Sequence, residues 1–510
     1  MDHRELQDPE NSNKNVRDIS SGHARHIKQR KTSIFWTGAV VALLLALSFG
    51  FAFKDSYRIQ LLKLAIRGFY FSPKQILSDF AFNRLGFWKN EERQPQGQVF
   101  PYWVLWMAPI LSGGGYSSEA WSYVEALDAS KSVPRLRILQ HGDLENLAFW
   151  TGLPDDMKAL AMKLYGGDFQ LNETVVICHS EPGAWYPPLF ETTPCPPNGY
   201  NEPFHVIGRT MFETDRVSDE HVRRCNKMDS VWVPTDFHVQ TFIKSGVDSS
   251  KVVKIVQAVD VDFFNPERWK PLPLPADGRL FGPKHSKEVK FLPKSAFVFI
   301  SIFKWEWRKG WDVLLKAYLQ EFSADDNVVL YILTKPYHSD RAFDDKLKDF
   351  VKSSGLQEPS RGWAAVYLSD AHVPQRELPR LYKAASAFVL PSRGEGWGRP
   401  HVEAMAMSLP VIATNWSGPT EYMTDYNSYP LPLDGMSEVK EGPFKGHFWA
   451  EPSSSQLRLI LRHVFSSPVE AKLKGIQARL DMVSKFSPAV VVKQVLHQLL
   501  QIHNLDQEST

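Results

Sequence analysis

Short apolar runs alternate with amphipathic stretches along the chain from about residue 100 onward. Continuous apolar runs of this length are typical of buried strands, and the segments between them have helical spacing. Such alternation predicts a parallel sheet with helices on both faces. The strand-like runs of the first half are Tyr102–Ile110, Arg135–Gln140, Thr174–Ser180, Pro203–Thr214 and Ser230–Thr235.

A proline- and lysine-rich stretch then interrupts the alternation, which is the composition of a linker. A second alternating series starts at Ala296–Phe303, and an apolar-striped helix is predicted near the C-terminus. The pattern therefore predicts an α/β fold with two doubly wound domains and a cleft between them. The predicted segments are a first domain at 100–266, a linker at 267–294, a second domain at 295–484, and a C-terminal helix and tail at 485–510.

Within the second series, the sequence RGEGWGRPHVEAMAMSLPVIAT carries two carboxylates, Glu395 and Glu403. It predicts a strand, a glycine loop, a helix near Pro400 and another strand. Both glutamates then face the carboxyl end of the sheet, where open α/β sheets bind ligands. Carboxylates accept hydrogen bonds from sugar hydroxyls, and a helix N-terminus favours phosphate. A nucleotide-sugar fits both groups, whereas the alternative is a surface helix with two solvated glutamates.

The N-terminal region predicts a membrane protein. The segment Ile34–Phe53 is twenty residues without a charge, which is long enough to cross a bilayer as a helix. A cleaved signal peptide is the competing interpretation, but more than thirty residues precede the apolar segment. We therefore expect a disordered cytosolic tail at 1–32, a transmembrane signal anchor at 33–53 and a stem at 54–99. The net charge of +2 gives no electrostatic reason to expect a nucleic-acid partner.

Three cysteines do not form a disulfide framework. Cys178 lies in an apolar strand-like run and is predicted to be a buried free thiol. Cys195 and Cys225 are able to pair if the body of the protein is lumenal. Asn172, in Asn-Glu-Thr, is a candidate glycosylation site just before a strand, and Asn415, in Asn-Trp-Ser, is a poorer one.

The two domains and the two-glutamate segment resemble the GT-B glycosyltransferases of the "glycosyl transferases, group 1" family, over roughly residues 100–505. The signature of that family is a pair of glutamates separated by seven residues. The resemblance implies two Rossmann-like domains facing a cleft, with the acceptor bound by the first domain and the donor by the second. In this chain a single transmembrane helix would precede them.

Residue roles are carried over from this resemblance. Glu395, Lys309 and His179 are predicted to be catalytic: Glu395 at the reacting end of the donor sugar, Lys309 on the diphosphate and His179 near the sugar. His141 is the rival histidine, and Glu213 is a candidate cleft residue without an assigned role. The predicted donor-binding residues are Gly113, Gly114, Gly115, Lys304, Arg308, Lys309, Val373, Glu395, Gly396, Gly398 and Glu403.

The chain departs from the family at one position. Many members have an arginine six residues before the lysine that corresponds to Lys309, and here that residue is Phe303. Lys304 or Arg308 is expected to supply the missing charge.

The resemblance implies a transferase that moves a sugar from a nucleotide-diphosphate donor to a glycan, lipid or protein acceptor. It also implies retention of the anomeric configuration, without a metal or another cofactor. A tail, an anchor, a stem and a catalytic body together predict a type II Golgi membrane protein, with the endoplasmic reticulum as the alternative. Two other functions remain open: a catalytically silent module that binds a sugar or a partner, and an epimerase or phosphorylase on the same fold.

Overall fold

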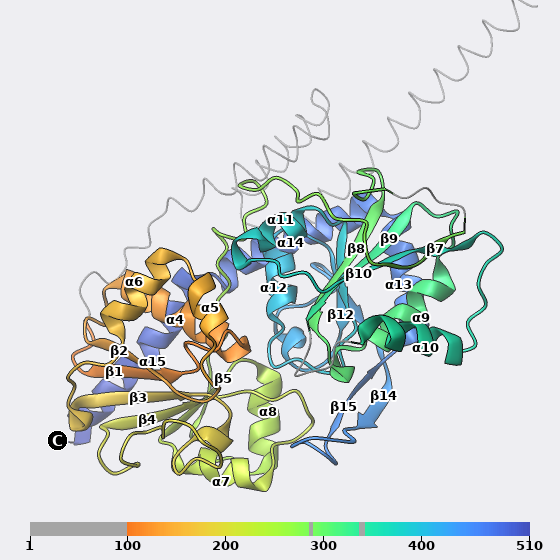
Figure 1. The fold of residues 1–510 in the computed structure, drawn as a ribbon. Coiled ribbons are helices and arrows are strands. Elements are labelled where there is room, and N and C mark those ends of the chain that lie inside the picture. Colours follow the sequence, from red (N-terminus) through yellow and green to blue (C-terminus); the bar gives the residue numbers. More distant parts are fainter. Residues whose placement is uncertain (1–98, 285–288, 336–341, 510) are drawn as a thin grey trace, which may run out of the picture. The chain divides into compact units, whose positions relative to one another are not determined.

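The computed structural model describes residues 99–284, 289–335 and 342–509 (Figure 1). The described residues belong to the second of the two units into which the chain divides, Gly97–Thr510.

The predicted membrane anchor at 33–53 lies outside the described residues, together with the predicted tail at 1–32 and nearly all of the predicted stem at 54–99. In the part of the chain that the structure does describe, no helix is both long enough and apolar enough to cross a bilayer. The anchor therefore stays a prediction from the sequence.

The first domain is built on a six-stranded parallel sheet. Its strands are β1 (Trp103–Ala108), β2 (Leu136–Gln140), β3 (Thr174–His179), β4 (His205–Arg209), β5 (Ser230–Val233) and β6 (Val252–Lys254). Its α-helices are α4 (Gly115–Ser130), α5 (Leu147–Gly152), α6 (Asp155–Leu164), α7 (Asp219–Lys227) and α8 (Asp236–Ser245). The strand order is β2-β1-β3-β4-β5-β6, and Figure 1 shows β2, β1, β3 and β4 side by side. The chain therefore changes direction across the sheet between β1 and β3, and a ligand site is expected at their carboxyl ends.

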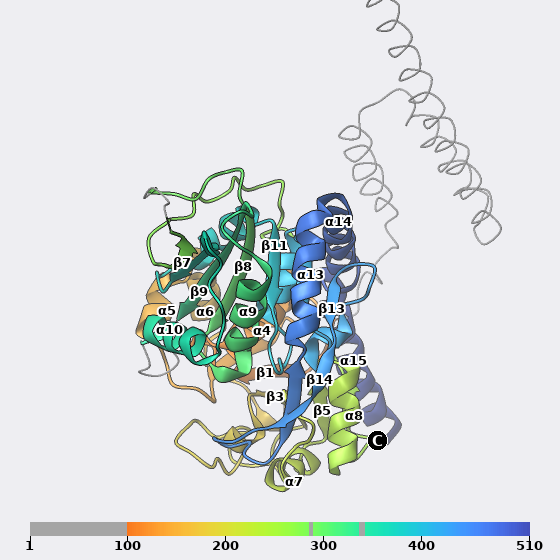
Figure 2. The ribbon, with the colours of Figure 1, turned by 90° about the vertical axis from the view of Figure 1, so that its right-hand side faces the viewer.

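The second domain contains a seven-stranded sheet. Its strands are β7 (Arg279–Pro283), β8 (Phe297–Lys304), β9 (Val328–Lys335), β10 (Gly362–Ser369), β11 (Ala387–Leu390), β12 (Val411–Thr414) and β13 (Tyr429–Leu431). Its α-helices are α9 (Trp311–Glu321), α10 (Phe343–Ser353), α11 (Leu378–Lys383), α12 (Arg399–Ala406), α13 (Ser454–Ser466) and α14 (Pro468–Lys485). A separate hairpin pairs β14 (Leu433–Glu438) with β15 (Phe448–Pro452), and Figure 2 shows α13 and α14 next to each other.

The order of the second sheet is β13-β12-β11-β8-β9-β10-β7. Without β7 this is the 3-2-1-4-5-6 order of a dinucleotide-binding sheet, which reverses between β8 and β11. Both strands are largely buried, as expected for a parallel sheet covered on two faces. The loops after β8 and β11 consequently meet at one edge of the sheet.

One predicted segment assignment needs correction, and the structure adds a packing partner for another. The range 267–294, predicted to be a linker, contains strand β7, which pairs antiparallel with β10 and extends the second sheet. The C-terminal helix α15 (Pro488–Ser509) packs against α4 of the first domain, and the C-terminus lies beside the first sheet (Figure 1). Local pattern predicted the helix, but its partner depends on a contact between segments far apart in the sequence.

Gly475 on α14 provides a test of the helix packing in the second domain. A Cβ at this position would overlap the Ser408 carbonyl oxygen, which follows α12. Alanine normally stabilises a helix relative to glycine, by about 1 kcal/mol. We predict the opposite sign for Gly475→Ala, a loss of about 1–3 kcal/mol from overpacking, seen as a lower thermal midpoint. Gly152→Ala is the control, because no atom lies within 4 Å of its added Cβ, and equal midpoints for the two variants would contradict this packing.

Candidate active site

The two-glutamate segment forms the connection that the sequence predicts. β11 ends at Leu390, a loop carries Glu395, and α12 starts at Arg399 with Glu403 one turn further on. Gly398 caps the helix with φ 96°, and a Cβ there would lie 2.7 Å from both His401 Nδ1 and the Tyr422 hydroxyl oxygen. A glycine is required at that turn.

The loop after β8 reaches the same place. Lys309 ends the short 3₁₀-helix Trp307–Lys309, and Gly310 follows with φ 64°. A Cβ at Gly310 would overlap the carbonyl oxygen of Pro391, so only glycine lets the two loops come this close. The Lys-Gly pair of the sequence is thus explained by the contact between the β8 and β11 loops.

An ion cluster forms where these loops meet. Lys309 Nζ lies 2.9 Å from both carboxylate oxygens of Glu395. Arg308 Nη1 donates to the Gly394 carbonyl at 2.6 Å and lies 3.3 Å from Glu395 Oε2. Its Nη2 donates to Glu306 Oε2 at 3.1 Å. The structure therefore brings together three predicted site residues, Arg308, Lys309 and Glu395.

The first domain adds a carboxylate to this ion cluster. Glu213, in the segment between β4 and α7, lies 3.3 Å from Arg308 Nη1, and its carbonyl accepts a hydrogen bond from Trp416 Nε1 at 3.3 Å. The neighbouring Met211 packs against Gly396, where a Cβ would come within 2.7 Å of the Met211 sulfur. The loop between β11 and α12, called the Glu395 loop below, is thus in direct contact with the first domain.

Arg393, which the sequence did not single out, anchors the beginning of the Glu395 loop. Its guanidinium pairs with both carboxylate oxygens of Asp312 at 2.9 Å. It also contacts both Glu451 oxygens, at 2.8 and 3.1 Å, and stacks on the Trp307 ring. A buried arginine held by two carboxylates fixes both loops of the site. Trp307 directly precedes Arg308 in the loop after β8, and Arg393 lies two residues before Glu395 in the loop after β11.

The two signature glutamates have opposite pKa shifts. Burial alone would raise the pKa of Glu395, but the adjacent Lys309 and Arg308 charges outweigh it and lower the pKa to about 2. Burial dominates at Glu403 and raises its pKa, although Arg399 and the hydrogen bond from Tyr382 oppose the shift. Glu395 is therefore a fixed negative charge, and Glu403 is a buried acceptor held by the Tyr382 hydroxyl at 2.9 Å.

The glycine loop after β1 lies at the carboxyl edge of the first sheet. Gly113 has φ 75°, Gly114 caps α4, and a Cβ at Gly114 would lie 3.3 Å from Asp143 Oδ2. Gly115 has open space around it. The glycine loop therefore lies at the switch point between β1 and β3. Its contact with donor phosphates stays a prediction.

His179 is placed differently from the prediction. Its ring is fully buried: Nδ1 accepts a hydrogen bond from Trp106 Nε1 at 3.0 Å, and Nε2 lies 3.0 Å from Glu119 Oε2. Glu119 also receives a hydrogen bond from Arg209 Nε at 2.9 Å. Since the tryptophan donates to Nδ1, the ring proton is on Nε2 and faces the carboxylate. His179 thus belongs to a buried polar network beneath the strand end, and this placement does not support a contact with the donor sugar.

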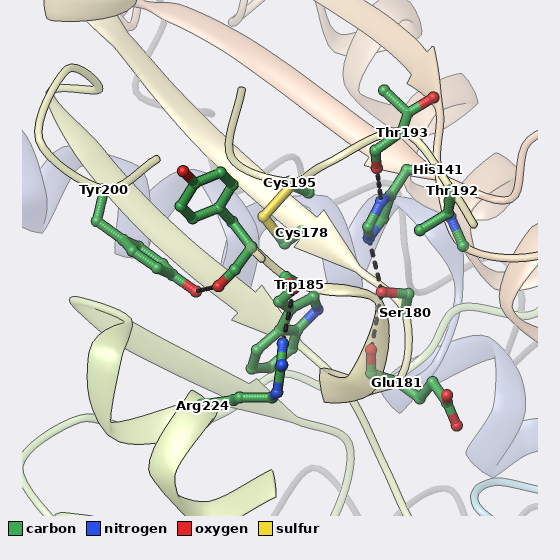
Figure 3. Close-up of a disulfide and its surroundings, with 12 residues drawn as sticks. His141, Cys178, Ser180, Glu181, Trp185, Thr192, Thr193, Cys195, Tyr200 and Arg224 are labelled. Atoms are coloured by element: carbon green, nitrogen blue, oxygen red, sulfur yellow. Dashed lines mark hydrogen bonds between the residues drawn. A yellow bond between two sulfur atoms is a disulfide. The ribbon is translucent and has the colours of Figure 1, made fainter. Parts of the chain in front are cut away.

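The rival histidine, His141, is also buried and braces a loop (Figure 3). Its Nδ1 faces the Thr193 carbonyl at 2.7 Å, and Nε2 lies 2.8 Å from the Ser180 hydroxyl. Only a protonated Nδ1 can bond a carbonyl, so Nε2 is the acceptor in the neutral ring. Burial lowers the pKa of His141 to about 4, which keeps the ring neutral.

The disulfide Cys178–Cys195 ties the same loop to strand β3 (Figure 3). The prediction of a free Cys178 is wrong, and so is the alternative pairing of Cys195 with Cys225, which is free and buried. Cys195 forms an isolated bridge with Trp185, which follows β3 in the chain, and the disulfide places Cys195 against Cys178 of the strand. Sequence spacing gives no sign of this contact.

The remaining predicted donor residues lie along the second sheet. Lys304 is exposed at the end of β8, and Val373 is half-buried after β10. Phe303 is buried in the core beside Trp305, so its side chain offers no replacement for the arginine found in many family members.

Comparison with known proteins agrees with this geometry. Residues 294–433 match the model of the family described as Glycosyl transferases group 1. The chain is 28% identical over 203 residues to the O-antigen chain mannosyltransferase B of Escherichia coli, which covers 37% of this chain and 49% of the relative. It is 30% identical over 160 residues to D-inositol 3-phosphate glycosyltransferase 1 of Catenulispora acidiphila, covering 30% of this chain and 37% of the relative. The matches thus span less than half of each relative's length.

Solved structures define the fold of both domains. A crystal structure of the Anabaena protein HepE in complex with UDP and glucose aligns with a TM-score of 0.53 and 13% identity, over 78% of this chain and 100% of that one. Sucrose-phosphate synthase from Thermosynechococcus elongatus aligns with a TM-score of 0.50 and 14% identity, over 79% and 99%. The described chain therefore has a GT-B-like α/β fold with two Rossmann-like sheets.

The low pKa of Glu395 predicts how its contribution to stability depends on pH. A carboxylate whose pKa falls from 4.5 to about 2 on folding stabilises the protein above pH 4.5 and loses this effect as the pH falls toward 2. At pH 7 we expect Glu395→Gln to lower the thermal midpoint, because Lys309 and Arg308 lose a partner. The difference in thermal midpoint between Glu395→Gln and the wild type should become smaller between pH 5 and pH 3.

The matched control for this experiment is Glu441→Gln, which changes an exposed glutamate outside the ion cluster. Its midpoint should follow that of the wild type at every pH. If the difference in thermal midpoint between Glu395→Gln and the wild type stays constant from pH 7 to pH 3, the ion cluster does not hold Glu395 ionised.

Proposed function

We propose that this protein is a glycosyltransferase that moves a sugar from a nucleoside-diphosphate sugar to an acceptor hydroxyl. The observation that carries the proposal is the meeting of Lys309, Arg308 and Glu395 at the switch point between β8 and β11. The match of residues 294–433 to the glycosyltransferase family and the names of the curated relatives support it.

The proposed reaction uses the charges of the ion cluster. The bond between the anomeric carbon and the phosphate oxygen breaks, and the acceptor oxygen bonds to the same face of the sugar, so that the configuration is retained. The hydroxyl proton of the acceptor passes to the departing phosphate oxygen. The ammonium group of Lys309 has three N–H donors, and two of them face the carboxylate oxygens of Glu395. The third donor is therefore available for a phosphate oxygen.

Glu395 would stabilise the positive charge that develops at the anomeric carbon, because it is ionised and has little exposed surface. Glu403 would accept from a ribose hydroxyl. Fixed cations beside the leaving phosphate would perform the charge stabilisation that a metal provides in other transferases, so we propose that the reaction needs no metal.

Nucleotide release from a panel of nucleotide-sugars, measured on the full-length protein with a chelator present, tests this proposal. We expect release from one donor and a decrease of about 10²-fold or more in Lys309→Ala and Glu395→Ala. Lys316→Ala, an exposed lysine on α9, is the control and should keep wild-type activity. Release that persists in both site variants would contradict the proposed site.

A catalytically silent GT-B protein is the second candidate function, and the buried Phe303 at the position of the arginine favours it. The same panel separates the two functions when binding is measured as well. Stabilisation by one donor with no turnover, after a search across glycan, lipid and protein acceptors, would assign the protein to this second function.

We further propose that residues 33–53 anchor the protein in the Golgi membrane with the catalytic body in the lumen. The disulfide Cys178–Cys195 supports this orientation, because disulfides persist in oxidising compartments and are rare in the cytosol. Asn172 is exposed, as a lumenal glycosylation site must be.

A glycosylation reporter fused to the C-terminus tests this topology in eukaryotic cells. We expect an endoglycosidase-sensitive increase in mass, and protection of the C-terminus from protease in intact vesicles. The same fusion without residues 33–53 is the control and should lose both properties. An unmodified C-terminus that protease digests in intact vesicles would overturn the lumenal orientation.

A further inference from the structure

The loop after β12 holds the backbone of Glu395. Ser417 lies in this loop, three residues beyond the end of β12, and is fully buried. Its hydroxyl oxygen accepts a hydrogen bond from the backbone N–H of Glu395 at 3.0 Å. The next residue, Gly418, donates its backbone N–H to the Glu395 carbonyl oxygen at 2.9 Å. Ser417 and Gly418 therefore hold the backbone of Glu395 on both sides of its Cα atom, and the ion cluster holds the carboxylate of the same residue.

The two loops pack backbone against backbone at this point. A Cβ at Gly418 would lie 2.6 Å from the Gly396 carbonyl oxygen and 2.8 Å from the Glu395 carbonyl oxygen, so a side chain there would push the loops apart. The strands that precede the two loops, β11 and β12, are paired neighbours in the sheet. The position of Glu395 is consequently determined by the loop after β12 as well as by its own loop.

Ser417 has a backbone conformation that serine rarely adopts. Its φ of 56° and ψ of -136° correspond to the first central position of a type II′ turn, where glycine is strongly favoured. A strained residue persists only where its surroundings fix the backbone, and such residues cluster at functional sites. Here the Thr420 N–H and hydroxyl both donate to the Ser417 carbonyl oxygen, at 3.1 and 2.7 Å. On the other side, Trp416 Nε1 donates to the carbonyl oxygen of Glu213 in the first domain. Hydrogen bonds of both neighbouring segments thus maintain the strain.

Neither glycine nor alanine would perform the same role at this position. Glycine would relieve the strain, but the buried N–H of Glu395 would lose its acceptor, which destabilises a folded chain. Alanine would lose the acceptor and keep the strain. The hydrogen bond to Glu395 therefore explains why a side chain occupies a position at which the backbone favours glycine.

The proposed reaction depends on where the Glu395 carboxylate lies. A displacement of about 1 Å at a reacting group lowers a rate by as much as about 10²-fold. We propose that Ser417 is a positioning residue for Glu395: its hydroxyl fixes the peptide from which the carboxylate reaches the anomeric carbon of the donor sugar. This inference rests on the proposed function and adds a residue that lies outside both the two-glutamate segment and the ion cluster.

Steady-state kinetics of nucleotide release by the full-length protein, with the donor and acceptor that support turnover, test this role. We expect Ser417→Gly and Ser417→Ala each to lower kcat about tenfold or more, because Glu395 loses its fixed position. The KM for the donor should stay close to that of the wild type, because Lys309 and Glu403 keep their places. Ser408→Gly is the matched control: Ser408 also has a positive φ, 61°, but it lies beyond the C-terminal end of α12, whereas Glu395 precedes the N-terminal end. This variant should keep the wild-type kcat.

The thermal midpoint distinguishes positioning from a purely structural role. Both Ser417 variants lack the hydroxyl and only glycine relieves the strain, so the midpoint of Ser417→Gly should lie above that of Ser417→Ala. If Ser417 positions Glu395, kcat falls equally in the two variants in spite of this difference. A kcat that recovers with the midpoint, or a wild-type kcat in both variants, would overturn the positioning role and leave the proposed function intact. A wild-type protein that releases nucleotide from no donor, with any acceptor, would overturn the proposed function and this inference with it.

Discussion

The contact of Lys309 with Glu395 is the interaction on which the rest of the site depends. A nearly buried carboxylate stays ionised only beside fixed positive charge, and Lys309 and Arg308 provide it. Two loops from non-consecutive strands must therefore meet, and the glycine at 310 removes the side chain that would keep them apart. Arg393 then locks both loops onto Asp312 and Glu451, so the charged groups are held in place before any ligand arrives.

The ion cluster also explains why both domains matter. Glu213 of the first domain pairs with Arg308, and Met211 of the first domain lies against Gly396 of the Glu395 loop. A donor bound to the second domain would thus be sensed by the first, because it competes for the same cations. The first domain contributes a second rigid feature, the loop held by the disulfide Cys178–Cys195 and by His141, at the carboxyl edge of its sheet (Figure 3). We expect an acceptor to be recognised at that edge, since it is the switch point of the first sheet.

Local sequence predicted the features that local geometry determines. The glycine and proline spacing around Glu395 predicted the loop and the start of α12, and the Lys-Gly pair predicted the position of Lys309. Features that depend on distant segments were missed. Arg393 has partners at 312 and 451, Cys178 has its partner only because the chain returns to β3, and α15 packs on a helix more than 350 residues earlier. His179 was expected near the sugar from the resemblance to the glycosyltransferase family, but its side chain on β3 points toward Trp106 and Glu119.

The most direct test of the central claim is an experimental structure of the protein with a bound nucleoside diphosphate. We predict phosphate oxygens within hydrogen-bonding distance of Lys309 Nζ, and a ribose hydroxyl on Glu403, at the edge between β8 and β11. A nucleotide bound elsewhere, with Lys309 still bonded to both oxygens of Glu395 and to no phosphate, would contradict it.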